Sequence, residues 1–362
     1  MARRIATVAI FLAAAVLLSS PLAGAARAAP PSPSPKQDIP AVFAFGDSTL
    51  DPGNNNRLNT LVRADHAPYG RDFPGGDATG RFSDGKLITD YIVESLGIKE
   101  LLPAYHDPSL TDAEAATGVS FASGGSGLDD LTTRTAMVST FASQIDDFKE
   151  LLGRIGAPKA AEIAGKALYV LSAGTNDVTM YTVLPIQASN YPSFDEYSDF
   201  LIDRFQSYIK SLYSLGARNF MVAGLPPVGC LPVQKTLHVL LPPLAFGGCS
   251  ERPNADAQMY NTKLQQMLTK LEANCSGSTF AYVDVYTPLL DMATNPRKYG
   301  FSQTGLGCCG TGLVEMGELC TNLLPLCPSP GSYMFFDSVH PTQATYKQLA
   351  DQIVQSNIPK FK

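Results

Sequence analysis

Three residue types that together can activate a nucleophile stand at two places far apart in the sequence. Ser48 follows the apolar run "AVFAFG", and Asp337 and His340 lie three residues apart in "FDSVHPT" near the C-terminal end. A serine hydroxyl is a weak nucleophile unless a base accepts its proton, and histidine can do so near neutral pH. A carboxylate orients the imidazole and stabilises its charged form. We therefore predict Ser48 as nucleophile, His340 as base and Asp337 as the orienting acid.

Other interpretations of these residues remain open at the level of sequence. "FDSVHPT" could simply begin a helix, with Asp337 or Ser338 as the cap and Pro341 in the first turn. Asp177 could replace Asp337 as the acid that orients the histidine. A catalytic acid only three residues before its histidine is unusual, but both side chains can share one short turn.

The competing candidates for nucleophile and base are weaker. Ser126 in "GGSG" has a nucleophilic side chain, but the turn is better explained as a source of backbone donors. No G-x-S-x-G occurs, so the nucleophile elbow of α/β-hydrolases is absent from this sequence. The chain has four histidines, and besides His340 we expect ordinary surface or loop roles for His66, His106 and His238.

Attack of a serine on a carbonyl creates an oxyanion, which needs hydrogen-bond donors fixed in advance. The backbone N–H of Ser48, a backbone N–H in the glycine turn at Gly124 and the side-chain amide of Asn176 could supply three. We predict these groups as the oxyanion hole.

Five apolar runs predict the strands that must position these residues. Runs buried on both faces are typical of a parallel sheet. The runs cover residues 41–46, 118–123, 167–172, 219–224 and 279–285.

Helical patterns separate the runs. Five apolar residues from Leu201 to Leu215 recur at helical spacing, and Gly216 fits the position just past the helix end. Further helices are expected around residues 141–152, 260–271 and 342–354. The alternation of strands and helices predicts an α/β fold with a doubly wound sheet of five parallel strands.

The candidate residues should converge on one edge of this sheet. Ser48 follows the first predicted strand, Gly124 the second and Asn176 the third. Ligands of such sheets bind beyond the carboxyl ends of the strands. We expect the stretch 336–342 to complete the site at the same edge.

The N-terminal end has the parts of a secretory signal peptide: a basic start, an apolar run from Ile5 to Leu18 and small residues that offer cleavage points. We expect residues 1–28 to be removed. An uncleaved anchor is the alternative, but the run is shorter than the ~20 residues of a membrane span. Residues 29–40 are predicted to form a Pro/Ser-rich tether, and residues 41–362 the folded domain.

Charge excludes several classes of partner. The formal net charge is −6 and no basic cluster occurs, which argues against nucleic acid. Lys and Arg form no helical stripe, so binding to anionic membranes has no support either. We expect a monomer that is exported and, once the signal peptide is removed, not inserted stably in a membrane.

Cysteine usage agrees with an oxidising compartment. Six of the seven cysteines lie in loop-like sequence from Cys230 to Cys327. They predict three disulfides, with 15 pairings open. A zinc site at Cys308, Cys309 and Cys320 is the disfavoured alternative, because no C-x-x-C pair supports it. Cys275 stands apart in "NCS", which makes Asn274 a glycosylation acceptor.

Seven motifs in order resemble the plant GDSL esterase/lipase family of SGNH hydrolases, from about Ala41 to the end of the chain. They are "FGDST", "DPGNNN", "TGRFSDGK", "FASGGSG", "SAGTND", "CCGTG" and "FDSVHPT". The resemblance implies a three-layer α/β/α sandwich (SGNH, flavodoxin-like) and hydrolysis of carboxylic esters. It also implies Ser48 as nucleophile, Gly124 and Asn176 in the oxyanion hole, and His340 with Asp337 as base and orienter.

The sequence departs from the family pattern at three positions. Thr49 replaces the leucine of GDSL, Asp84 replaces a common asparagine and Phe336 replaces a common tryptophan. None of these changes removes a chemical role, although Thr49 and Phe336 could alter an acyl pocket.

The function we predict is a secreted serine ester hydrolase that cleaves lipid acyl esters through an acyl-enzyme, with no metal and no organic cofactor. An acyltransferase or a polysaccharide deacetylase with the same triad is the alternative. A non-catalytic wall-binding protein is a third possibility, against which the intact Ser48, Asp337 and His340 argue. We expect an extracellular or cell-wall location, with the endoplasmic reticulum as the alternative.

The cysteines generate a first prediction. Residues 308–327 immediately precede the Asp337–His340 turn and lack a helical or strand period, so covalent closure should fix the position of this turn. Each loop of ~15 residues should stabilise the fold by about 3 kcal/mol in the entropic model. A reductant should therefore lower both the melting temperature and the activity, whereas EDTA should change neither. Activity lost with EDTA and restored by zinc would contradict this prediction.

Overall fold

The fold is described from a computed structural model, which covers residues 39–183, 185–240 and 248–361. The predicted signal peptide and nearly all of the predicted tether lie outside the described residues. The boundaries proposed at residues 28 and 40 therefore stay predictions.

A five-stranded parallel sheet forms the centre of the fold, in the order β2–β1–β3–β4–β5. Each strand lies within one of the five predicted apolar runs, so the predicted α/β fold is confirmed. All residues of the first two strands are buried, as expected for strands covered on both faces. The strands are β1 Val42–Gly46, β2 Gly118–Ser120, β3 Leu168–Ser172, β4 Asn219–Ala223 and β5 Thr279–Val283.

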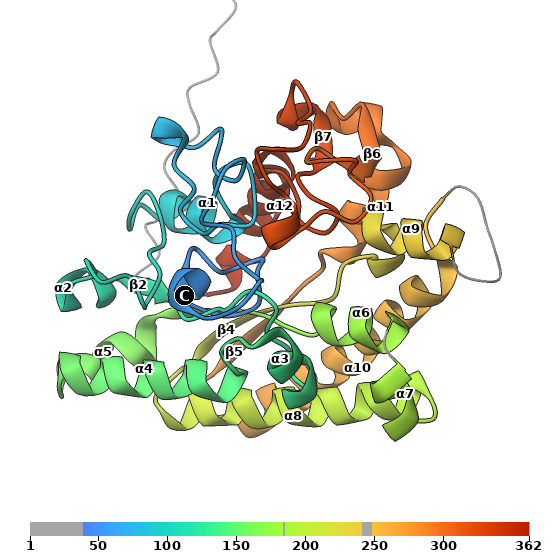
Figure 1. The fold of residues 1–362 in the computed structure, drawn as a ribbon. Helices are drawn as coiled ribbons and strands as arrows, with labels where there is room; N and C mark the ends of the chain where they lie inside the picture. Colours follow the sequence, from blue (N-terminus) through green and yellow to red (C-terminus); the bar gives the residue numbers. More distant parts are fainter. Residues whose placement is uncertain (1–38, 184, 241–247, 362) are drawn as a thin grey trace, which may run out of the picture. The chain divides into compact units, whose positions relative to one another are not determined.

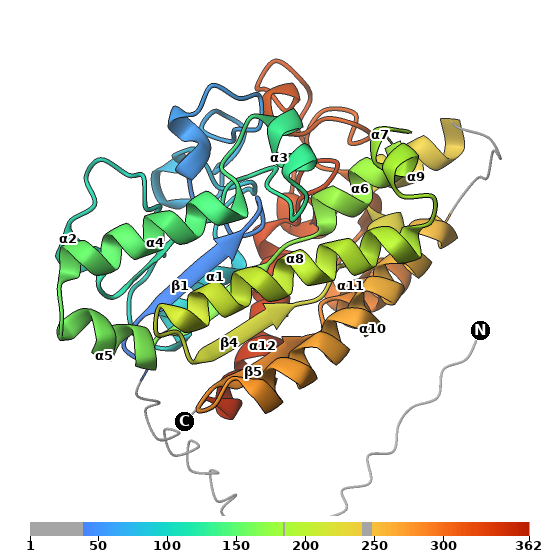
Figure 2. The ribbon, with the colours of Figure 1, turned by 90° about the horizontal axis from the view of Figure 1, so that it is seen from below.

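Helices cover both faces of this sheet. In Figures 1 and 2, α4, α8 and α10 lie on one face and α1, α11 and α12 on the other, which gives three layers. None of the helices in the described part of the chain is long and apolar enough to cross a bilayer. The first six helices are α1 Ile88–Ser95, α2 Asp112–Ala115, α3 Asp130–Ala136, α4 Phe141–Ile155, α5 Lys159–Lys166 and α6 Thr175–Val183. The later ones are α7 Pro185–Asn190, α8 Phe194–Ser214, α9 Pro232–Leu240, α10 Glu251–Asn274, α11 Tyr286–Thr294 and α12 Gln343–Ser356.

Helix α8 shows how local sequence signals set the helix bounds. The hydroxyl of Ser193 caps its first turn by accepting a hydrogen bond from the backbone N–H of Glu196. The helix ends at Ser214, and Gly216 follows the C-cap with a φ of 108°, which confirms its predicted place. The apolar stripe of α8 is buried against the core.

An aromatic cluster fills the layer between the sheet and α4. The ring of Phe43 lies 5.0 Å from that of Phe148 on α4, and the ring of Phe45 lies 5.0 Å from that of Phe121. All four side chains are almost fully buried. Such ring pairs add about 0.5–1.5 kcal/mol to the burial of their area, so β1 is anchored firmly in the core.

The strand order creates a crevice beside β1. The chain passes from β1 to one neighbour, β2, and then crosses to the other neighbour, β3. The connections that follow β1 and β3 therefore diverge at the carboxyl edge, which is where parallel α/β sheets bind ligands. This is the flavodoxin-like order, and it places the segments after β1 and β3 at one rim.

A second, smaller core surrounds two of the three disulfides. Strands β6 Gln303–Gly307 and β7 Tyr333–Phe335 form a two-stranded parallel sheet that the sequence analysis did not predict. The loop between them carries Cys308–Cys327 and Cys309–Cys320, and the third disulfide joins Cys230 to Cys249. Cys275 is free and buried. The prediction of three disulfides is confirmed, and these sulfurs are not available for the alternative zinc site.

Helix α12 begins later than the helix-start interpretation of "FDSVHPT" requires. The cap is Thr342, whose hydroxyl accepts from the backbone N–H of Thr345, so the capping role considered for Asp337 or Ser338 is wrong. Pro341 precedes this cap and pairs with Phe335 in an isolated bridge. The stretch 336–341 is thus a turn placed directly before the helix.

A buried carboxylate, Asp84, ties this turn to the segment after β1. Its Oδ1 accepts from the backbone N–H of Gln343 at 2.8 Å, and the neighbouring Ser83 donates to the carbonyl oxygen of Pro341. Oδ2 of Asp84 is buried without a hydrogen-bond partner in the described part of the chain. Burial raises the pKa of Asp84 from 3.8 to about 6.

Asp84 generates a prediction about stability and pH. Because its pKa is raised on folding, the folded state favours the protonated acid, and stability falls as the pH rises through about 4 to 6. The loss is roughly 3 kcal/mol at most, since one pKa unit is about 1.4 kcal/mol. Asp84→Asn should therefore raise the melting temperature at pH 8 and leave it unchanged near pH 4.

The matched control is Asp146→Asn, which changes an exposed carboxylate on α4. Thermal unfolding at both pH values should show no pH-dependent gain for this control. An Asp84→Asn protein that is less stable than the original at pH 8 would contradict the assignment of a buried, partly unpaired anion.

Candidate active site

Ser48 stands on a tight turn directly after β1. The turn is closed by a hydrogen bond from the backbone N–H of Leu50 to the carbonyl oxygen of Asp47. β1 ends at Gly46, where a Cβ would lie 2.0 Å from the backbone oxygen of Ser172. Glycine is therefore required for the close approach of β1 to β3, and Ser48 emerges next to the end of β3.

Gln144 on α4 holds the last peptide of β1 in place. Its side-chain oxygen accepts from the N–H of Gly46 at 2.8 Å, and its nitrogen donates to the carbonyl oxygen of Gly46 at 2.9 Å. The same nitrogen lies 3.2 Å from the hydroxyl of Ser126. The amide thus fixes the start of the Ser48 turn from the side of α4.

His340 joins Ser48 to Asp337. Its Nε2 lies 2.7 Å from the hydroxyl oxygen of Ser48, and its Nδ1 lies 2.6 Å from Oδ2 of Asp337. All three residues are buried, with Ser48 at 6 % and His340 at 5 % exposure. This is the geometry in which an imidazole can accept the serine proton while a carboxylate holds the opposite nitrogen.

The short spacing between acid and base results from the shape of the turn. Oδ1 of Asp337 accepts from the backbone N–H groups of Val339 and His340, at 2.8 and 2.7 Å. The N–H of Phe336 donates to the carbonyl oxygen of His340 and closes the turn. The carboxylate therefore folds the backbone with one oxygen and orients the imidazole with the other.

Tyr69 also contacts this carboxylate, and sequence reasoning missed it. Its hydroxyl donates to Oδ2 of Asp337 at 2.7 Å and accepts from the backbone N–H of Gly317 at 2.8 Å. Burial, with the neighbouring Asp337 carboxylate, raises the pKa of Tyr69 well above its usual value. The only signal in the sequence is a tyrosine between Pro68 and Gly70 in a segment without periodicity, which does not indicate a partner.

Two of the three predicted oxyanion donors, the side-chain amide of Asn176 and the backbone N–H of Ser48, are available at the site. Asn176 stands in the first turn of α6, just after β3, and lines the same cavity as Ser48 and His340. Its side-chain nitrogen donates one hydrogen bond to the carbonyl oxygen of Ser126, which leaves the second amide hydrogen for another acceptor. The backbone N–H of Ser48 donates to no acceptor in the described part of the chain.

The third predicted donor is engaged elsewhere. The N–H of Gly124 donates to Oδ2 of Asp51 at 2.8 Å, and burial raises the pKa of Asp51 to about 6. A Cβ on Gly124 would lie 2.7 Å from the ring of Phe82, which explains why glycine stands here. In this structure Gly124 therefore packs and anchors its turn rather than presenting a free donor.

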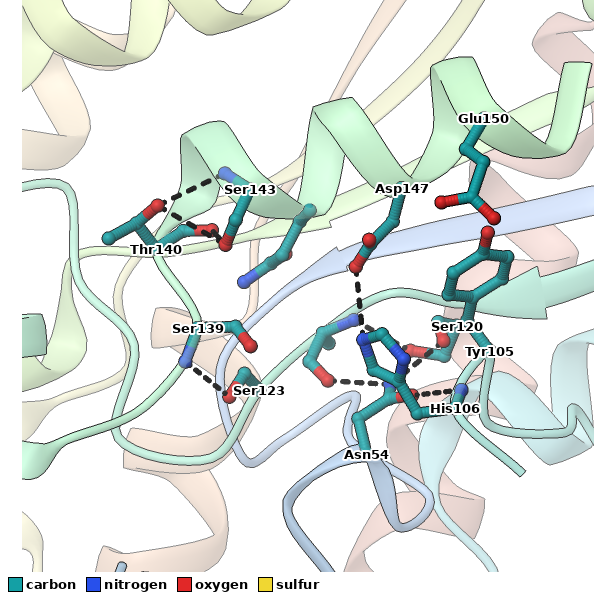
Figure 3. Close-up of polar contacts among 12 residues, drawn as sticks. Asn54, Tyr105, His106, Ser120, Ser123, Ser139, Thr140, Ser143, Asp147 and Glu150 are labelled. Atoms are coloured by element: carbon teal, nitrogen blue, oxygen red, sulfur yellow. Dashed lines mark hydrogen bonds and ion pairs between the residues drawn. The ribbon is translucent and has the colours of Figure 1, made fainter. Parts of the chain in front are cut away.

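The "DPGNNN" motif holds the segment after β2. The side-chain nitrogen of Asn54 donates to the carbonyl oxygens of Ser120 and Ala122, and that of Asn55 donates to Gly124. In Figure 3, Asn54 lies against Ser120 and also accepts from the backbone N–H of His106. These amides continue the hydrogen bonding of the sheet edge beyond the strand.

The alternative acid and nucleophile do not meet His340. Asp177 accepts from the backbone N–H groups of Leu128 and Asp129, so it closes a loop instead. Burial raises the pKa of Asp177 to about 6. Ser126 is buried and contacts Gln144.

Two of the other histidines, His66 and His106, stand away from Ser48. His106 pairs with Asp147 on α4 at 3.0 Å (Figure 3), and His66 lies 3.8 Å from a carboxylate oxygen of Glu318. The side chain of His238 lies outside the described part. These contacts connect neither His66 nor His106 to Ser48.

An apolar cavity of about 100 Å³ opens beside Ser48 and His340. It extends between the sheet and the layer of α1, α11 and α12. Apolar side chains dominate its walls; they include Ile88, Ile92, Val170, Met221, Val283, Leu289, Met334, Leu349 and Ile353. Among the residues that the structure describes, no group of three or more His, Cys, Asp or Glu side chains could hold a metal ion.

A parallel α/β sheet with a Ser–His–Asp arrangement at its switch point is characteristic of a serine hydrolase. The sequence profile of the GDSL-like Lipase/Acylhydrolase family matches residues 42–353, and the chain belongs to this family.

Curated plant proteins support the same assignment. The chain is 45 % identical over 332 residues to GDSL esterase/lipase At2g40250 of Arabidopsis thaliana, covering 90 % of this chain and 92 % of the relative. It is 43 % identical over 351 residues to GDSL esterase/lipase At2g31540 of the same plant, covering 95 % of each. A solved structure, a lipase from a goat rumen metagenome, aligns with 88 % of this chain and 97 % of its own length. The sequence identity is 13 % and the TM-score is 0.38. The protein is a carboxylic ester hydrolase.

The contact of Tyr69 with Asp337 generates a prediction. In Tyr69→Phe, Asp337 loses one of its four hydrogen-bond donors, so the carboxylate and the imidazole that it orients are held less firmly for proton transfer. A hydrogen bond to a charged group is worth ~1.5–3 kcal/mol, so kcat should fall by roughly tenfold while KM stays nearly unchanged.

Tyr333→Phe is the matched control, because Tyr333 is a tyrosine that packs against the same small core as Tyr69. Its kcat should stay within ~2-fold of that of the unchanged protein. If Tyr69→Phe loses thermal stability while its kcat stays within ~2-fold of the original, the role of Tyr69 is structural only.

Proposed function

We propose that this protein hydrolyses lipid acyl esters with Ser48 as nucleophile, His340 as general base and Asp337 as the acid that orients His340. The observation that carries the proposal is the position of His340, within 2.7 Å of the Ser48 hydroxyl and 2.6 Å of the Asp337 carboxylate. No other histidine side chain described in the structure hydrogen-bonds to a serine hydroxyl.

The first half of the reaction acylates Ser48. Nε2 of His340 accepts the hydroxyl proton while the oxygen of Ser48 attacks the ester carbonyl carbon. Asp337 stabilises the imidazolium that forms, and His340 then passes this proton to the departing alkoxide. The alcohol leaves and the acyl group remains on Ser48. In the second half His340 activates a water molecule in the same way, and the acid is released.

The negative charge on the carbonyl oxygen requires donors. The free N–H of Ser48 and the spare amide hydrogen of Asn176 are suited to this role, and removal of one such donor typically costs 10²–10³ in kcat. Gly124 serves in the hole only when its hydrogen bond to Asp51 is exchanged for one to the substrate.

The apolar cavity supports an acyl group as the part of the substrate that is recognised. Its walls begin at Ser48 and His340 and continue into the apolar layer between the sheet and α12. An acyl chain that enters the cavity would leave water and contact apolar side chains. Burial of each CH₂ group would contribute about 0.8 kcal/mol to binding. Binding in this cavity would therefore favour longer acyl chains over acetyl groups.

Export of the protein is supported by its covalent chemistry. The chain has three disulfides, and structural disulfides form and persist mainly in oxidising compartments such as the secretory pathway and the cell exterior. Asn274 is exposed at the end of α10, where the enzyme that attaches glycans could reach it. We propose an extracellular or cell-wall location, with a glycan on Asn274.

Ser48→Ala tests the assignment. The variant should lose at least ~10³-fold in kcat/KM on a panel of acetyl to long-chain acyl esters, since the nucleophile is removed. It should also lose covalent labelling by a fluorophosphonate probe, while its melting temperature stays within ~2 °C because the side chain is small.

Ser126→Ala is the matched control and should keep both activity and labelling. Labelling that persists in Ser48→Ala and disappears in Ser126→Ala would overturn the proposal. A panel with the highest kcat/KM on acetyl esters would exclude a preference for lipid acyl groups, and transfer of most acyl groups to an added glycerol acceptor would identify an acyltransferase.

A further inference from the structure

Large apolar side chains are exposed at one place on the surface. Nine such side chains in the described part of the chain are prominently exposed, and seven belong to two segments, around Leu61 and between Cys309 and Cys327. Leu61, Leu319 and Leu323 are 73 %, 61 % and 90 % exposed. We call this set the apolar rim: Leu61, Leu313, Val314, Met316, Leu319, Leu323 and Leu324. Soluble monomers rarely gather exposed apolar side chains in this way unless the surface binds something.

The two segments of the rim contact each other directly. The backbone N–H of Glu318 donates to the carbonyl oxygen of Leu61, and a Cβ on Gly317 would lie 2.9 Å from the same oxygen. Cys308–Cys327 and Cys309–Cys320 close the loop that carries the other six side chains. This covalent closure restricts the conformations of the loop, and its apolar side chains are exposed in the structure.

The rim carries almost no unpaired charge. The carboxylate of Glu315 points into its own loop and accepts from the backbone N–H groups of Thr311 and Val314. Glu318 pairs with Arg63 at 2.7 Å. Residues 308–327 contain neither lysine nor arginine. Such a surface fits an uncharged apolar phase better than an anionic membrane, which is attracted by clusters of lysine and arginine.

The rim borders the catalytic turn. The N–H of Ser338, between Asp337 and His340, donates to the carbonyl oxygen of Glu315, and Gly317 donates to Tyr69. Figure 2 shows the orange-red segment between β6 and β7 beside the blue segment that follows β1, at the carboxyl edge of the sheet. A molecule held at the rim is therefore next to the turn that carries His340.

We propose that the apolar rim docks this protein on the surface of an uncharged lipid phase, a film or droplet of neutral esters, so that esters reach Ser48 from that surface. The proposal rests on the proposed function for its choice of partner. A lipid surface can bury all seven side chains at once without pairing any charge. The apolar rim lies beside the turn that carries His340. Esters in the docked lipid surface would therefore reach Ser48 from this face.

The test measures binding separately from catalysis. The full mature chain carrying Ser48→Ala is mixed with a triolein emulsion and recovered by flotation, with and without Leu319→Gln plus Leu323→Gln. The two substitutions should weaken binding by ~10-fold or more, because both leucines lose their burial in the lipid. Met259→Gln, which changes an exposed apolar residue on α10, is the matched control and should float like the parent.

The same double variant with Ser48 intact should lose turnover of emulsified triolein in proportion to binding, while kcat/KM on a water-soluble short-chain ester stays within ~2-fold. Unchanged flotation of the double variant would overturn the proposal, even if the ester hydrolysis is confirmed. Preferential binding to phosphatidylserine vesicles over the emulsion would overturn it in favour of an anionic membrane. A dimer that the double variant converts to monomer in size-exclusion chromatography would instead identify the rim as an interface between copies of this chain.

Discussion

A single buried carboxylate determines the geometry of the whole site. Asp337 has no exposed surface and accepts four hydrogen bonds, from the backbone N–H groups of Val339 and His340, from the imidazole of His340 and from the hydroxyl of Tyr69. A buried anion is tolerated only when its acceptor positions are satisfied. Two of these donors shape the turn, the third is the imidazole that the same turn carries, and the fourth belongs to the distant Tyr69, which also contacts Gly317 in the disulfide loop. The carboxylate therefore ties the turn before the last helix, the disulfide loop and the segment after β1 to one point.

The remaining parts of the site are held by side chains that bind backbone. Asp51, Asn54 and Asn55 fasten the segment after β2, and Gln144 fastens the end of β1. Each of them supplies donors or acceptors to peptide groups that no longer have a neighbouring strand. The strands determine the direction in which each loop leaves the sheet. The hydrogen bonds of these polar side chains fix the positions of the loop peptides. The carboxyl edge of the sheet is therefore held in place by side-chain hydrogen bonds, although it contains little regular structure.

The architecture could be predicted from the sequence, because the patterns that indicate strands and helices are local. The apolar run that became β1 and the stripe of α8 with Gly216 can be recognised without knowing what they contact. The meeting of Ser48 with His340 could be expected, because strand ends converge in parallel sheets and the residue types are complementary. The disulfide pairings could not be derived, since six cysteines in loops without periodicity have no local preference among partners.

Contacts made by ordinary residues were beyond sequence reasoning. Tyr69 is a common residue type in a loop, and nothing near it in the chain indicates that its partner is Asp337, 268 positions away. The engagement of Gly124 by Asp51 is similar, because both belong to recognised motifs but the competition for one N–H depends on side-chain rotamers. Sequence patterns predict which groups are present at a site, and packing decides which of them are free.

The distance along the chain between Ser48 and His340, the proposed nucleophile and base, has a consequence for biosynthesis. Ser48 and His340 are 292 positions apart, and the disulfide loop that borders the base comes almost as late. Domains of a nascent chain fold from the N-terminal end as they emerge. A chain synthesised as far as residue 300 already contains Ser48 but has neither His340 nor Asp337. If the proposed roles hold, catalytic competence is acquired only after Asp337 and His340 have been synthesised, long after Ser48.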